Sequence, residues 1–121
     1  MSKCIVVEDD AFWSAEVGAA LAQAKIEVIY AGNGFQALEI AQLYPNARMV
    51  LDIILPEMDG VAVLKELRFV APNMAVLAIS GGGLLGASFY MKLARTFGAK
   101  GQLAKPFTPR QLLDEWAALA A

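Results

Sequence analysis

The chain has 121 residues, which suits one domain with its own hydrophobic core and leaves no room for a second globular unit. Its 12 acidic and 10 basic side chains give a net charge of -2, so there is no excess of positive charge to bind a nucleic acid directly. The only cysteine, Cys4, excludes an internal disulfide bond. No signal-peptide core precedes Glu8, and the expected compartment is therefore the cytoplasm.

Short apolar runs alternate along the chain with longer segments whose apolar residues recur at helical spacing. The runs 4–7, 27–31, 49–51, 75–79 and 101–104 are predicted strands, and the segments 11–24, 34–44, 60–69, 85–97 and 108–120 are predicted helices. The first, third and fourth strands are apolar throughout, which is typical of strands that helices cover on both faces. The pattern predicts an α/β fold, a doubly wound five-stranded parallel sheet with five helices, as a single domain over residues 1–121.

Residues 69–91 carry no charge, and an uncharged stretch of this length resembles a membrane span. Pro72 and the glycines at 81–83 interrupt it, however, and would break a spanning helix. A strand, a glycine loop and the start of a helix explain the stretch better, so we expect no membrane segment.

Polar side chains follow four of the predicted strands at the point where each strand ends. They are Glu8, Asp9 and Asp10 after the first strand, Asp52 after the third, Ser80 after the fourth and Lys105 after the fifth. Because ligands bind at this edge of an open parallel sheet, we expect these side chains to converge. Crowded carboxylates repel one another unless a cation intervenes, and oxygen ligands of this kind suit Mg²⁺. A lysine and a hydroxyl supply donors for a phosphoryl group, and a carboxylate beside a metal can act as its nucleophile.

Each of these residues also has an ordinary structural explanation. Asp9 or Asp10 can cap the following helix, Ser80 can cap the fourth helix, and Lys105 can be a solvated charge. The combination at four strand ends of one sheet favours a functional site, whereas no single residue does.

Four segments together resemble the response-regulator receiver family of two-component signalling. They are residues 5–10 (IVVEDD), 51–60 (LDIILPEMDG), 78–81 (AISG) and 103–107 (LAKPF), and the resemblance runs from Lys3 to Leu119. It implies a flavodoxin-like fold with strand order 2-1-3-4-5. It also implies that Asp52 accepts a phosphoryl group, in a magnesium-dependent reaction, from a histidine kinase or a histidine phosphotransfer protein.

The same resemblance assigns roles around Asp52. It implies that Mg²⁺ is ligated by Asp9, Asp52 and the backbone carbonyl of Ile54, and that Glu8 acts through a metal-bound water. It further implies that the phosphoryl group is contacted by Ser80 and Lys105, that Gly81 belongs to the phosphoryl loop, and that a cis peptide bond precedes Pro106. The chain would catalyse only its own phosphorylation and dephosphorylation, and so would not be an enzyme acting on other substrates.

The resemblance places the signalling output on the face formed by the fourth helix, the fifth strand and the fifth helix, where a separate downstream protein would bind. We place four candidate partner contacts there, namely Phe89, Tyr90, Gln102 and Trp116. Gln102 stands where many family members have an aromatic rotamer switch, so the usual aromatic relay is not expected. The sequence shows no output domain after the fifth helix, and we expect a stand-alone regulator or phosphorelay shuttle, as a monomer or weak dimer.

Alternative functions depend on particular residues. The glycines at 81, 83 and 86 match the G-x-G-x-x-G pattern of dinucleotide sites, but no acidic residue occurs between Glu66 and Asp114, and the pattern follows the fourth strand instead of the first. An aspartyl phosphohydrolase would need a second acid where Ile54 stands, and a flavodoxin-like cofactor binder lacks a phosphate loop after the first strand. The remaining alternative is a receiver-like interaction module that does not depend on phosphorylation.

Overall fold

The computed structural model describes residues 2–81 and 87–120. Strands and helices alternate along the chain, as predicted. They are β1 (Lys3–Val7), α1 (Ala11–Gln23), β2 (Glu27–Ala31), α2 (Gly34–Leu43), β3 (Arg48–Asp52), α3 (Gly60–Val70), β4 (Val76–Gly81), α4 (Ala87–Thr96), β5 (Gly101–Lys105) and α5 (Pro109–Ala118). Of the three glycines that match the dinucleotide pattern, those at 83 and 86 lie outside the described residues.

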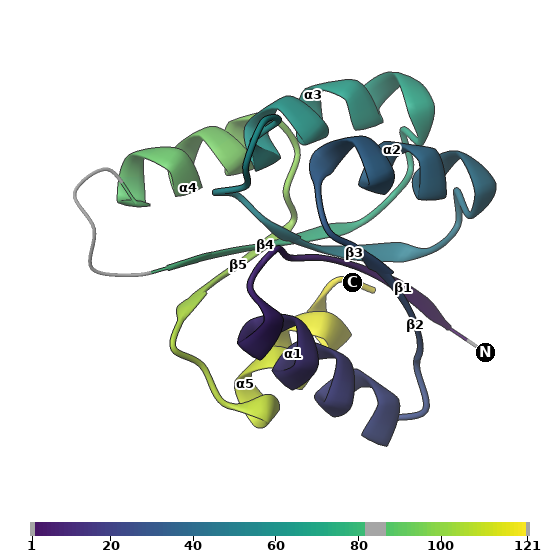
Figure 1. Cartoon of the computed structure of the whole chain (residues 1–121), viewed down its shortest axis with the longest axis vertical. Coiled ribbons are helices and arrows are strands. Elements are labelled where there is room, and N and C mark those ends of the chain that lie inside the picture. The colour runs from purple at the N-terminus through teal and green to yellow at the C-terminus, as the bar shows by residue number, and fades with distance from the viewer. Residues whose placement is uncertain (1, 82–86, 121) are drawn as a thin grey trace.

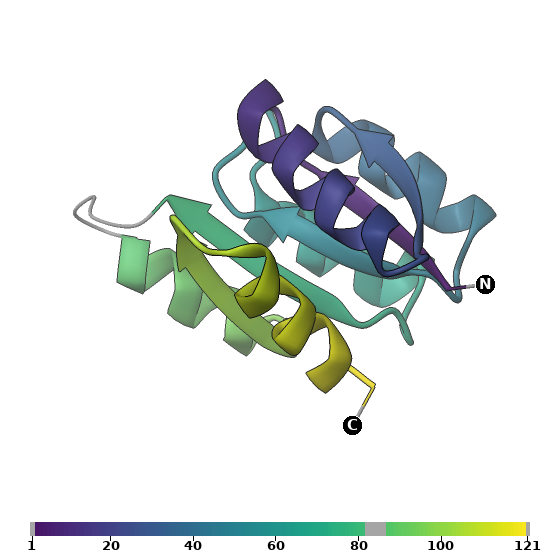
Figure 2. The same ribbon diagram turned by 90° about the horizontal axis from the view of Figure 1, so that it is seen from below.

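The strands form one parallel sheet in the order β2-β1-β3-β4-β5, which confirms the expected topology. Helices α2, α3 and α4 cover one face of the sheet, and α1 and α5 lie side by side on the other (Figures 1 and 2). The strand order reverses between β1 and β3, because β2 lies on one side of β1 and all later strands lie on the other. In doubly wound sheets, such a reversal opens the crevice in which ligands bind.

Two hydrophobic clusters fill the space between the sheet and its helices. Along β1, Ile5 and Val7 belong to the cluster beneath α2 and α3, whereas Cys4 and Val6 belong to the cluster beneath α1 and α5. Successive side chains of a strand point to opposite faces, so a strand with a helical layer on each side must be apolar throughout. This explains the uninterrupted apolar runs in the sequence.

Side-chain caps determine where several helices begin. Asp10 caps α1 by accepting a hydrogen bond from the Trp13 N–H at 3.0 Å, and Asp59 caps α3 in the same way through the Ala62 N–H. Thr108 and Gln111 form a reciprocal capping box at α5. The alternative that Asp10 caps the following helix is therefore confirmed.

The structure places Trp116 in the core, and its assignment to the partner face was wrong. Its side chain belongs to the cluster beneath α1 and α5 and is only 7% exposed. The Arg48 guanidinium lies 4.7 Å from its ring centroid and also donates a hydrogen bond to the Trp116 carbonyl. Trp116 is thus an internal residue of α5 that a partner cannot reach.

Within the described residues, no helix combines the length and the apolar character that crossing a membrane requires. The uncharged stretch that resembles a span contains the end of α3, strand β4 and the start of α4. Pro72 lies between α3 and β4, where the predicted interruption falls.

Candidate functional site

Three carboxylates meet at the crevice between β1 and β3. Glu8 and Asp9 follow β1, and Asp52 is the last residue of β3. One carboxylate oxygen from each lies within 4.8 Å of the others. Glu8 and Asp52 are each only 4% exposed, while Asp9 is open to solvent. A group of oxygen donors with one open side fits a hard cation such as Mg²⁺, which keeps part of its water shell.

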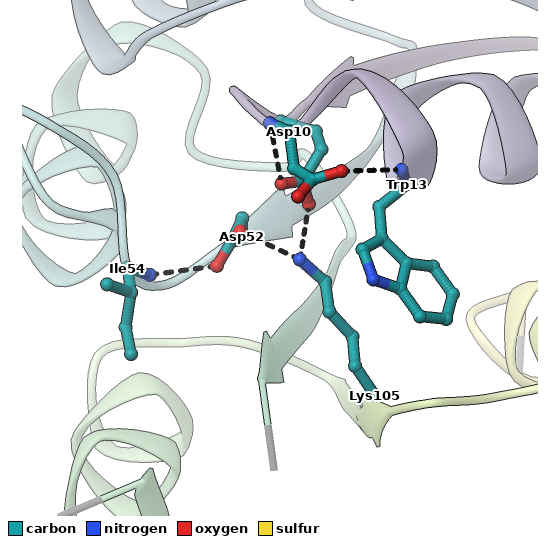
Figure 3. Close-up of polar contacts among 6 residues, drawn as sticks. Asp10, Trp13, Asp52, Ile54 and Lys105 are labelled. Carbon is teal, nitrogen blue, oxygen red and sulfur yellow. Dashed lines mark hydrogen bonds and ion pairs between the residues drawn. The ribbon is translucent and has the colours of Figure 1, made fainter. Parts of the chain in front are cut away.

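Lys105, at the end of β5, extends its ammonium toward the Asp52 carboxylate (Figure 3). Its Nζ donates to Glu8 Oε2 at 2.8 Å and to Asp52 Oδ2 at 3.0 Å. The lysine side chain is 11% exposed, which excludes the alternative of a solvated surface charge. The structure thus brings together two carboxylates and one ammonium that are far apart in the sequence.

The charges of the site perturb one another. Burial raises the pKa of the Glu8 carboxyl to about 7; the hydrogen bond from Lys105 opposes this rise, and the neighbouring Asp52 adds to it. Burial lowers the pKa of the Lys105 ammonium, but its two carboxylate partners together outweigh burial and raise that pKa. The site therefore holds three carboxylates and one ammonium, which contacts two of them, and this excess of negative charge favours a second cation.

The second oxygen of Asp52 is also held. Asp52 Oδ1 accepts a hydrogen bond from the Ile54 backbone N–H at 2.9 Å (Figure 3). With Lys105 on Oδ2, both carboxylate oxygens have fixed partners, so the carboxylate keeps one orientation. Residue 54, where an aspartyl phosphohydrolase would need a second acid, is an isoleucine, and it is 44% exposed.

Gly60 lies against the backbone that carries Asp52. A Cβ at this position would lie 2.5 Å from Ile53 Cα and 2.7 Å from the Asp52 carbonyl oxygen, closer than real Cβ atoms approach. The Gly60 N–H also donates to the Ile53 carbonyl at 2.8 Å. Only a residue without a side chain lets α3 begin this close to the end of β3. Sequence reasoning did not identify this role, although the Asp59-Gly60 pair at a helix start was its signal.

Ser80 lies in β4, beside both β3 and β5. It follows Ile79, the Cα partner of Asp52, and its own partner on β5 is Ala104, the residue before Lys105. Its hydroxyl is buried, and Ser80 Oγ has no hydrogen-bond partner among the described residues. Ser80 lies within β4 and not at the start of the described part of α4, which argues against the alternative that it caps this helix. Gly81 pairs with Lys105, and a Cβ there would meet no described atom within 4 Å.

The family model described as "Response regulator receiver domain" matches residues 4–117. The chain belongs to the response regulator receiver family. It is 30% identical over 115 residues to the response regulator receiver protein CpdR of Brucella abortus, covering 95% of this chain and 93% of that protein. Its structure is similar to that of chemotaxis protein CheY4 of Vibrio cholerae, with a TM-score of 0.88, 26% identity and 98% of each chain covered.

Other relatives of this receiver domain are longer. It is 30% identical over 110 residues to the transcriptional regulatory protein PhoP of Bacillus subtilis, covering 91% of this chain and 45% of that protein. The chain spans about half the length of the transcriptional regulators that it matches. Receiver domains are signalling domains of two-component systems and not conventional enzymes.

The receiver domain carries an aromatic residue beside its lysine that sequence reasoning missed. Trp13, in the first turn of α1, has its ring centroid 5.6 Å from Lys105 Nζ. The ring also packs against Phe107 at a centroid distance of 4.7 Å, with the two ring planes tilted by 38°. No local sequence pattern predicts that Trp13, Phe107 and Lys105 lie together, because Trp13 and Phe107 come from opposite ends of the chain.

Gln102 makes polar contacts in the place where many receiver domains have an aromatic switch. Its Nε2 donates to the Met91 carbonyl, and its Oε1 accepts from the Arg95 guanidinium at 3.2 Å. Both contacts join β5 to α4, and Gln102 is half-buried between them. The Lys105-Pro106 peptide bond is cis, as the family resemblance implies.

Proposed function

We propose that this receiver domain, over residues 1–121, accepts a phosphoryl group on Asp52 in a magnesium-dependent reaction. The observation that carries the proposal is the position of the Asp52 carboxylate, which is buried and oriented by Lys105 and by the Ile54 N–H. A carboxylate held in this way is a suitable nucleophile for covalent phosphoryl transfer.

In the reaction, an oxygen of the Asp52 carboxylate attacks the phosphorus atom of the donor. An O–P bond forms while the bond from phosphorus to the leaving group breaks. The electron pair of the broken bond leaves with the imidazole nitrogen of a phosphohistidine, or with acetate when acetyl phosphate is the donor. The product is an acyl phosphate on Asp52.

Two donors would bind the transferred oxygens. The Lys105 ammonium already contacts Asp52, and it would exchange this carboxylate for a phosphoryl oxygen. The Ser80 hydroxyl is buried without a partner among the described residues, which is costly unless a ligand supplies one. An incoming phosphoryl oxygen beside β4 would supply that partner. Gly81, which follows Ser80 in β4, is the proposed phosphoryl-loop residue beside the same group.

The carboxylates fit the magnesium ion that the proposal requires. Asp9, Asp52 and the Ile54 carbonyl would hold the ion directly, and Glu8 would act through a bound water. All of these donors are oxygen atoms, the ligand type that Mg²⁺ prefers. When bound, the ion supplies positive charge to offset the roughly -1.5 to -2 charge of a phosphoryl group.

The proposed partners follow from the family. A histidine kinase or a histidine phosphotransfer protein would supply the phosphoryl group in the cytoplasm, and a separate protein would read the phosphorylated state. Phe89 and Tyr90, which are 60% and 40% exposed on α4, are the proposed contacts for that downstream protein. Buried Trp116 is not one of the proposed contacts. Gln102, which is bonded to Met91 and Arg95 of α4, would contribute through that helix.

The proposal is tested by the intact mass of the protein after incubation with acetyl phosphate and Mg²⁺. We expect an adduct of one phosphoryl group that disappears with a chelator and in the Asp52→Asn variant. Asp114→Asn, which changes an exposed acid on α5, is the matched control and should keep the adduct. If magnesium binds but no adduct forms, the protein is instead an interaction module that does not depend on phosphorylation.

A further inference from the structure

The Trp13 ring is fixed in place by its neighbours on both sides. Its backbone N–H is bound by the helix cap Asp10, and its ring meets Phe12 edge-on at a centroid distance of 5.3 Å and Phe107 at 4.7 Å. Phe107 lies just after the strand that ends in Lys105. These three rings, Phe12, Trp13 and Phe107, form an aromatic trio that connects the start of α1 to the segment after β5.

The trio borders the ammonium group of the site. Lys105 Nζ lies 5.6 Å from the Trp13 ring centroid, within the range of a cation–π interaction (Figure 3). Among the described residues, the polar partners of the ammonium are the carboxylates of Glu8 and Asp52. The ring therefore adds an attraction for the ammonium that does not involve an oxygen atom.

The carboxylates and the Trp13 ring would behave differently as contacts of Lys105 during the phosphoryl transfer. Under the proposed function, an Asp52 oxygen would enter the new O–P bond and Glu8 would turn to a metal-bound water, so both carboxylate contacts of Lys105 would weaken. The Trp13 ring has no oxygen for a metal or phosphorus to take, and its contact with Lys105 can persist. The geometry points to Trp13 as a positioning residue, which keeps the Lys105 ammonium over the site while its carboxylate partners are exchanged for a phosphoryl oxygen.

This inference rests on the proposed function, and its test separates the two. The rate of phosphorylation by acetyl phosphate at saturating Mg²⁺ would be compared for the wild type, Trp13→Leu and Trp13→Phe. We expect Trp13→Leu to slow the reaction about three- to tenfold, because leucine fills space without attracting a cation. Trp13→Phe, which keeps a ring, should restore most of the rate. The control Phe69→Leu removes an aromatic ring that is 82% exposed at the far end of α3, and should leave the rate unchanged.

A double-mutant cycle shows whether Trp13 acts through Lys105. In a Lys105→Met background, Trp13→Leu should not slow phosphorylation further, because the ammonium that Trp13 positions is absent. Equal fold losses in both backgrounds would overturn the inference. So would a Trp13→Leu variant that is phosphorylated as fast as the wild type, while the proposed function would then stand.

A spectroscopic measurement tests the contact without any phosphorylation. The chain has two tryptophans, so two indole N–H signals are expected by NMR, and the Trp13→Phe variant assigns them. Lys105→Met and Mg²⁺ should each shift the Trp13 signal and leave that of buried Trp116 in place. A Trp13 signal that responds to neither change would overturn the inference, even if Asp52 is phosphorylated normally.

Discussion

The Lys105 ammonium lies 3.0 Å from the Asp52 carboxylate, across β4, the strand that separates β3 from β5. The same ammonium lies 2.8 Å from Glu8, so one cation joins the ends of β1, β3 and β5. The site is therefore assembled before a phosphoryl donor arrives. A phosphoryl group would meet a carboxylate and an ammonium that already occupy fixed positions.

The raised pKa of Glu8 predicts a pH-dependent stability in metal-free buffer. An acid with a pKa of about 7 in the fold and an ordinary, lower value in the unfolded chain stabilises the fold when it is protonated. Its contribution is complete at low pH and is lost as the pH rises toward and through 7. Glu8→Gln cannot ionise and avoids this loss. Urea denaturation with EDTA should show the stability of Glu8→Gln relative to wild type improving by about 2 kcal/mol between pH 5 and pH 7.5. If the difference in stability between Glu8→Gln and the wild type does not change with pH, the pKa of the Glu8 carboxyl is not raised in the folded protein.

Magnesium should stabilise the fold through the three carboxylates. A ligand that binds only the folded state at about ten times its Kd adds about 1.4 kcal/mol of stability, which raises the thermal unfolding temperature. We expect Asp9→Asn to weaken this rise, because Asp9 is the carboxylate of the site that faces solvent. Differential scanning fluorimetry with increasing MgCl₂ measures the effect, with Asp114→Asn as a control that should respond like the wild type. A response in Asp9→Asn equal to the wild type would place the ion elsewhere.

Gly60→Ala should damage both the fold and the site. The added Cβ would fall within 2.7 Å of the Asp52 carbonyl and 2.5 Å of Ile53 Cα, so the start of α3 has to move. Overpacking of this kind costs about 1–3 kcal/mol, and the displaced Asp52 should be phosphorylated more slowly. Gly32→Ala is the matched control, since its Cβ would meet only the flexible end of Gln36 at 3.5 Å. Equal stabilities for the two variants in urea would show that α3 has room to adjust.

The thiol of Cys4 should be unreactive in the folded protein. Burial raises its pKa to about 12, and the thiolate is the reactive form. Iodoacetamide at pH 8 should leave Cys4 unmodified in the native state and modify it fully in denaturant, as measured by intact mass. Rapid modification without denaturant would mean that β1 opens readily.

Local sequence patterns predicted the strands and helices, because each of them carries its own signal, whereas the strand order was predicted from the family resemblance. Apolar strands with polar ends predicted which residues share one edge of the sheet, and Lys105 and Asp52 do meet there. Trp116 was assigned to the partner face because the family resemblance places the signalling output on α5. The helical spacing of Leu112, Trp116 and Leu119 was the better guide, since all three lie in one core cluster. The contact of Trp13 with Lys105 could not be predicted, since it depends on side-chain packing between α1 and the segment after β5.

The acyl phosphate itself offers the most direct test of the central claim. After phosphorylation with acetyl phosphate and Mg²⁺, borohydride should reduce the acyl phosphate to an alcohol and convert the modified aspartate to homoserine. Peptide mass analysis then locates the change. We predict homoserine at position 52 and at no other acid. Homoserine at another position, or none in a protein that binds Mg²⁺, would contradict the assignment of Asp52 as the phosphoacceptor.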